Sequence, residues 1–82
     1  MPSETQIISE IENIVGTSYT YWTIGITIDP SQCKKQHHNP SYWHYCDAGS
    51  ESSARHIEEY FVDKGMKGET GGGSHPHYVY IF

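Results

Sequence analysis

The sequence has 82 residues, enough for one domain with a modest hydrophobic core, and we expect residues 1–82 to form a single domain. Ten acidic residues against five basic ones give a net charge of −5. This charge argues against a general nucleic-acid binder, because such proteins neutralise phosphates with Lys and Arg. It is compatible with a protein partner that is itself basic.

The sequence contains no apolar run of the roughly 18 residues that a membrane span requires, so we expect no membrane-spanning segment. Its first residues lack the basic stretch that opens a signal peptide, which favours a cytoplasmic protein. Cysteines stay reduced in that compartment, and we therefore expect Cys33 and Cys46 to be free thiols.

Residues 3–15 have the pattern of an amphipathic helix. Ser3 and Gln6 stand at the spacing of a capping box, and Gly16 is a typical C-terminal stop. The apolar residues at positions 7, 8, 11, 14 and 15 recur with helical spacing, so they share one face.

Residues 19–28 are rich in aromatic and β-branched side chains and predict a strand. Alternation along this strand would place Tyr21, Thr23 and Gly25 on one face and the isoleucines at 24, 26 and 28 on the other. A glycine weakens a strand, so Gly25 suggests close approach by another backbone or a ligand.

The remaining elements follow from caps and turn residues. Asp29 and Pro30 open a short helix that runs to about His37, and residues 42–47 predict a second strand. Ser50 or Ser52 would cap a helix over about 52–64. We expect a flexible loop over 65–74 and a final strand over 77–82. This alternation predicts an α/β (α+β) fold with a small three-stranded mixed sheet flanked by three helices.

Two segments resemble the GIY-YIG endonucleases. Residues 25–37, GITIDPSQCKKQH, match the family's second motif in one register, at Gly25, Thr27, Asp29, Lys35 and His37. Residues 50–65, SESSARHIEEYFVDKG, resemble the family's metal-binding helix, in which an Ala precedes the catalytic Glu by four positions. That pair falls on Ala54 and Glu58. The two matches cover about half the chain and imply a GIY-YIG-like fold.

The departures from the family pattern concern catalysis. The motif's Tyr falls on Thr23, and the family's catalytic Arg, which stabilises charge on the phosphate, falls on Cys33. The family's first strand is absent upstream, so we expect residues 77–82 to take its place beside residues 21–27. The family's Asn after the Glu helix also has no counterpart. The resemblance therefore implies a nuclease-like fold with most of its catalytic residues missing.

We expect one cleft to be formed by Tyr21, Thr23, Gly25, His37 and Glu58. If the chain is active, the catalytic residues would be Tyr21, His37 and Glu58, with Glu58 holding Mg²⁺ or Mn²⁺. The alternative is that Glu58 has no catalytic role and lies at the edge of an apolar helical stripe, where its carboxylate reaches water. The residues with a binding role would be Thr23, Gly25, Lys34, Lys35 and Lys67.

The histidines and the glycine-rich segment can each be explained either by structure alone or by a chemical role. Six histidines are numerous for this length, and scattered surface positions are the favoured explanation. A zinc site that combines Cys33, His37, His44 and Cys46 is the alternative, since Cys33 and His37 are spaced for one helical face. Residues 68–74, GETGGGS, suit a hinge before the last strand or a cradle for an anion.

Two functions remain open at this point. The first is a cytoplasmic binding module that needs no cofactor, has lost nuclease activity and holds a protein, a nucleotide or a nucleic-acid end. The second is a divergent phosphodiesterase that requires Mg²⁺ or Mn²⁺ and in which Lys34 or Lys35 replaces the missing Arg. The sequence leaves the partner and the oligomeric state open.

Overall fold

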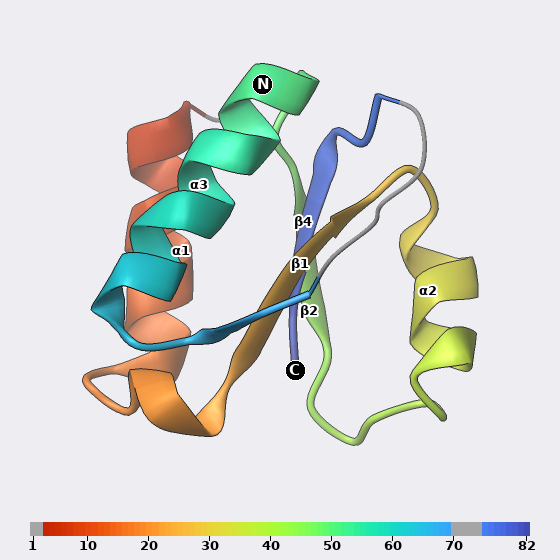
Figure 1. The fold of residues 1–82 in the computed structure, drawn as a ribbon, viewed down its shortest axis with the longest axis horizontal. Helices are drawn as coiled ribbons and strands as arrows, with labels where there is room; N and C mark the ends of the chain where they lie inside the picture. The colour runs from red at the N-terminus through yellow and green to blue at the C-terminus, as the bar shows by residue number, and fades with distance from the viewer. Residues whose placement is uncertain (1–2, 70–74) are drawn as a thin grey trace.

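The computed structural model describes residues 3–69 and 75–82 and has the mixed α+β architecture that the sequence predicts (Figure 1). Within these residues the elements are, in chain order, α1 (Glu4–Val15), η1 (Tyr19–Tyr21, a short 3₁₀ helix), β1 (Thr23–Thr27), α2 (Pro30–Gln36), β2 (His44–Asp47), α3 (Glu51–Lys64), β3 (Lys67–Gly68) and β4 (Tyr78–Ile81).

The sheet has four strands in the order β2-β4-β1-β3, one more than predicted. β4 is antiparallel to both β1 and β2, and this confirms the predicted pairing of the last strand beside the first. The additional strand is β3, which the sequence placed in a loop. It lies parallel to β1, where the Glu69 amide donates to the Ile24 carbonyl at 2.9 Å. A strand of two residues has no periodicity from which it could be recognised.

The helices lie on both faces of the sheet, with α1 and α3 on one face and α2 on the other (Figure 1). The main core fills the space under α1 and α3. Its largest fully buried hydrophobic side chains come from those helices and from β1 and β4: Ile7, Ile11, Ile24, Ile57, Phe61, Val79 and Ile81. None of the helices in the described ranges is both long and apolar enough to cross a membrane.

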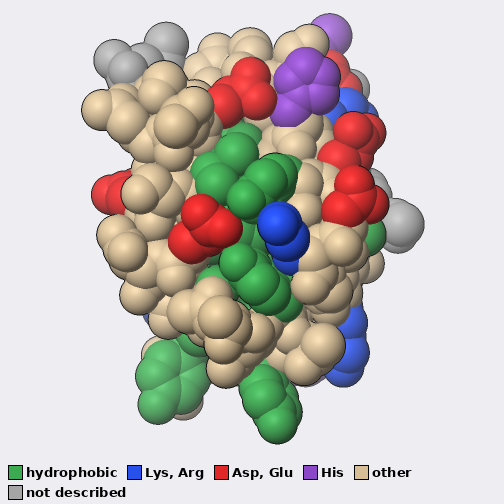
Figure 2. All heavy atoms as spheres, turned by 90° about the vertical axis from the view of Figure 1, so that its left-hand side faces the viewer, with side chains coloured by type: hydrophobic (Ala, Val, Ile, Leu, Met, Phe, Trp, Pro, Cys, Tyr) green, Lys and Arg blue, Asp and Glu red, His purple; other side chains and the backbone are tan. Residues whose placement is uncertain are grey.

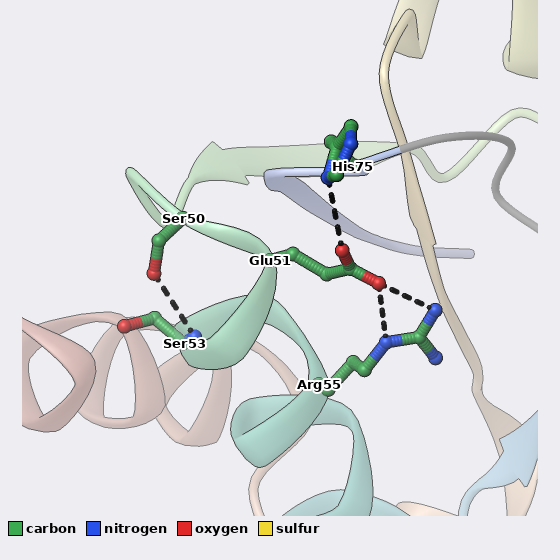
Figure 3. Close-up of polar contacts among 5 residues, drawn as sticks. All are labelled: Ser50, Glu51, Ser53, Arg55 and His75. Carbon is green, nitrogen blue, oxygen red and sulfur yellow. Dashed lines mark hydrogen bonds and ion pairs between the residues drawn. The ribbon is translucent and has the colours of Figure 1, made fainter.

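Helix caps fix the element boundaries. Ser3 and Gln6 form the predicted capping box of α1, and the Asp29 carboxylate accepts from the Gln32 amide at the start of α2. For α3 the cap is Ser50, whose hydroxyl accepts from the Ser53 amide at 3.2 Å (Figure 3). The helix therefore begins at Glu51, slightly before the predicted start at about residue 52.

The predicted strand over 19–28 is too long. Residues 19–21 form η1, where the Trp22 amide donates to the Tyr19 carbonyl at 3.1 Å. Extended pairing starts only at Thr23, whose amide donates to the Phe82 carbonyl at 2.8 Å. The end of β4 thus determines where β1 begins, and the preceding aromatic residues have no neighbouring strand to pair with.

Candidate functional site

Gly25 lies beneath an aromatic ring on the α2 face of the sheet. It pairs directly with Tyr80 across β1 and β4. A Cβ atom at position 25 would lie 2.9 Å from the Tyr80 Cε1 atom and closer still to the ring's hydroxyl end, so no side chain fits while the ring keeps this place. The close approach predicted at Gly25 is therefore made by a side chain rather than by a backbone or a ligand.

A pocket of about 560 Å³ lies between α2 and this face of the sheet. Its size falls within the range of small-ligand sites. Most of the described residues that line it have polar side chains: Thr27, Asp29, Gln32, Cys33, Gln36, His37, Glu69 and Tyr80, with Ile26 and Ile28 completing the wall. The Thr27 hydroxyl accepts from the Asp29 amide at 3.1 Å, which fixes the turn from β1 into α2.

Two residues of the pocket lining, His37 and Tyr80, belong to an aromatic cluster. The Tyr80 hydroxyl lies 3.4 Å from the His37 Nε2 atom, and the ring of Tyr80 stacks on Trp43 with centroids 4.9 Å apart. Phe82 packs against His37 with centroids at 4.5 Å. Burial, together with the nearby Cys33 thiol, raises the pKa of Tyr80 well above its usual range, so its hydroxyl stays protonated. Tyr80 can thus serve the pocket as a hydrogen-bond donor.

The charges of the pocket are acidic. Asp29 and Glu69 line it, whereas the described lining includes no Lys or Arg. Lys34 and Lys35 lie in α2 but outside the lining, and Lys67 is exposed on β3. The lysines predicted to bind therefore lie outside this pocket, which is better suited to a cation than to a phosphate.

The structure does not bring the five predicted cleft residues together, and the prediction of one shared cleft is wrong. His37 lines the pocket, and Gly25 lies under Tyr80. Tyr21 is 86% exposed in η1, and Thr23 begins β1 outside the pocket lining. Glu58 belongs to α3, on the opposite face of the sheet from α2 (Figure 1). The 3₁₀ turn breaks the alternation that would have aligned Tyr21 with Gly25.

Glu58 lies at the edge of the core. Its neighbours Ala54, Ile57 and Phe61 on the same helix are fully buried, and its own side chain is half-buried. The Oε2 atom is buried with no hydrogen-bond partner among the described residues. Burial raises the pKa of this carboxyl group, an effect that the nearby Arg55 partly opposes.

A second cluster of polar side chains lies on the α1 side of the sheet. His44 and Cys46 alternate with Tyr45 along β2, so both face α1, where Glu10 meets them. The Cys46 thiol donates to the Glu10 carboxylate at 3.3 Å, and its Sγ atom lies 3.5 Å from the His44 Nε2 atom. Burial and the Glu10 carboxylate raise the pKa of the Cys46 thiol to about 12.

The four residues predicted as a zinc site do not lie together, because the sheet separates them into two pairs. Cys33 and His37 face the α2 pocket, whereas His44 and Cys46 lie across the sheet from them. The two thiols are free, as predicted. Glu10, which completes the second cluster, was missed because its helical position predicts only an exposed side chain. No local sequence signal links Glu10 to residues some 35 positions away, which come near it only in the folded chain.

The outer face of α1 and α3 also carries hydrophobic side chains. Figure 2 shows them gathered in the middle of this face, bordered by acidic and basic groups. Ile14 is 41% and Val62 is 40% exposed, and the Lys64 ammonium group lies 5.3 Å from the centre of the Tyr60 ring.

Within the described residues, the α2 pocket and the Glu10–His44–Cys46 cluster are thus two distinct groups of polar side chains. Comparisons of the chain with models of protein families, with curated proteins and with solved structures find no significant match.

Proposed function

We propose that this chain is a cytoplasmic binding module with a GIY-YIG-like fold and no nuclease activity, and that its α2 pocket holds a Lys or Arg side chain of a basic protein partner. The observation that carries this proposal is the composition of the pocket. Two acidic residues, Asp29 and Glu69, line it together with Tyr80, with no Lys or Arg among the described lining residues.

Each of these groups favours a cation. The carboxylates attract positive charge, and the Tyr80 hydroxyl oxygen can accept a hydrogen bond. The carboxamide oxygens of Gln32 and Gln36 can accept hydrogen bonds from a guanidinium or ammonium group. The net charge of −5 draws a basic partner from a distance.

The same pocket disfavours a phosphate. Nucleotides and nucleic-acid ends carry negative charge, which Asp29 and Glu69 would repel. Cys33 stands where the resemblance to the nucleases places a catalytic Arg, and its side chain is buried against the sheet. A nuclease needs a cation at the scissile phosphate, and this position supplies none.

Isothermal titration of the purified chain with a short Arg-rich peptide tests the proposal. We expect binding that weakens with salt and that Glu69→Gln reduces several-fold. Glu59→Gln is the matched control, because it removes the same charge from an exposed position on α3. Equal losses in both variants would show only a general charge effect. Saturable binding of AMP in this pocket, with no binding of the peptide, would contradict the proposal.

The alternative function is a metal-dependent phosphodiesterase that uses Glu58. We expect no cleavage of duplex DNA in Mg²⁺ or Mn²⁺, because Tyr21, His37 and Glu58 do not share a pocket. Cleavage by the unmodified chain that disappears in Glu58→Gln would establish this alternative and refute the non-catalytic role.

A further inference from the structure

We propose that Glu10, His44 and Cys46 form a binding site for Zn²⁺ that joins β2 to α1. This site is independent of the α2 pocket and of the function proposed for it. The three side chains come from two elements that are distant in sequence, and their ligand atoms all lie within 4.8 Å of one another.

The distances between the ligand atoms match the coordination sphere of zinc. In a tetrahedral site with Zn–S near 2.3 Å and Zn–N or Zn–O near 2.0–2.1 Å, the sulfur lies roughly 3.5 Å from each of the other ligand atoms. Cys46 Sγ lies 3.3 Å from Glu10 Oε2 and 3.5 Å from His44 Nε2. The sulfur thus already stands at nearly the required separation from both partners, and only the remaining pair needs to adjust.

The chemistry of the donors selects the metal. A thiolate and an imidazole suit Zn²⁺ and similar transition metals, whereas Mg²⁺ prefers a set of oxygen ligands. A Cys46 thiolate and the Glu10 carboxylate together supply two negative charges, which balance a divalent cation. The thiol proton that Cys46 now donates to Glu10 would leave as the metal binds.

The three protein ligands leave a fourth position for water or an outside group, as in zinc sites that are open to solvent. The fold explains why such a site would matter. Among the strands that the structure describes, β2 lies at the edge of the sheet and pairs with β4 alone, and Glu10 lies on α1. A metal ion would therefore fasten the edge of the sheet to the helix layer.

Titration of the reduced full chain with Co²⁺ tests the site, since a Co²⁺–thiolate bond gives a charge-transfer band in the near ultraviolet. We expect one equivalent of Co²⁺ to produce this band, Zn²⁺ to abolish it by displacement, and Mg²⁺ to have no effect. Cys46→Ser should remove the band. His44→Gln and Glu10→Gln should each raise the Kd for Zn²⁺ by more than about 100-fold, beyond the roughly 10–100-fold effect of outer-shell changes.

Cys33→Ser is the matched control, because it removes the other thiol from the opposite side of the sheet and should leave the band intact. Circular dichroism verifies that each variant is folded. Glu10→Gln, at an exposed helical position, keeps the test valid even if Cys46→Ser unfolds. Metal binding that survives Glu10→Gln and His44→Gln unchanged, or a band lost in Cys33→Ser alone, would overturn the proposal. So would a reduced chain that binds no Co²⁺.

Discussion

The contact between Gly25 and Tyr80 can be tested by adding a single methyl group. In Gly25→Ala the new Cβ would overlap the Tyr80 ring, 2.9 Å from Cε1 and closer to the hydroxyl end. Overpacking of this kind costs about 1–3 kcal/mol. Replacing a glycine inside a strand by alanine also stabilises the folded state by about 0.5–1 kcal/mol, because the chain then loses less conformational entropy on folding. We therefore expect a net loss of roughly 1–2 kcal/mol.

The sign of the effect should reverse when the ring is absent. Tyr80→Val keeps a residue of high strand propensity in β4 but removes the atoms that the Ala would meet. In this background Gly25→Ala should stabilise the chain by about 0.5–1 kcal/mol. The coupling between the two positions should therefore reach roughly 2 kcal/mol, well above the value for independent sites.

Urea unfolding of the four proteins measures this coupling directly. The loss in Gly25→Ala should also lower Tm by roughly 5–15 °C, given the usual 4–8 °C per kcal/mol in domains of this size. If Gly25→Ala destabilises both backgrounds equally, the ring is not the reason for the glycine. A stabilising effect in the unmodified background would also refute the packing of Tyr80 over Gly25.

Three further predictions concern the stability of the fold. Burial raises the pKa of Glu58 above its unfolded value of 4.5, so its ionisation disfavours folding. Glu58→Gln should therefore be more stable than the parent near pH 7, and urea unfolding should show this advantage shrinking as pH falls toward about 4.5 and absent below it. A hydrogen bond from His77 lowers the pKa of Asp47, so the stability it contributes is present above the unfolded pKa and lost as pH falls through the folded one. Asp47→Asn should reduce this acid-induced loss, and an unchanged acid slope would argue against the pair. Ser50→Ala removes the cap of α3 and should lower the free energy of unfolding by about 1 kcal/mol. Ser52 lies inside the first turn of the helix, so Ser52→Ala should change this free energy little. Equal shifts of Tm in the two variants would refute the assignment of the cap to Ser50.

The helices could be predicted because the signals that define them are local. Ser3 and Gln6 satisfy each other's backbone groups within one turn, and Asp29 with Pro30 starts α2 in the same way. Gly65 ends α3 at the predicted residue, with a φ of 121° that favours glycine. These interactions join residues a few positions apart, so the sequence contains all the information that they need.

The limits of the strands could not be predicted, because they depend on distant partners. Tyr19 and Tyr21 have high strand propensity, yet β4 ends before it could pair with them. Tyr19 instead packs against Phe61 of α3, and its hydroxyl donates to Glu12. Tertiary contacts thus override propensity in this segment. The glycine-rich residues 70–74, for which a hinge or an anion cradle was predicted, lie outside the described residues.

The composition of both candidate sites depends on the register of β4. Direct pairing of Val79 with Cys46 turns the thiol toward α1, while pairing of Tyr80 with Gly25 turns the aromatic ring toward α2. Spacing within the chain indicates that Cys33 and His37 share a helical face and that His44 and Cys46 share a strand face. It does not reveal on which side of the sheet each pair lies. A shift of β4 by one residue against β2 would exchange those sides, and Cys46 would then face α2 instead of Glu10. The separation of a zinc-type cluster from an acidic pocket is therefore a property of strand pairing, which no single segment of the sequence specifies.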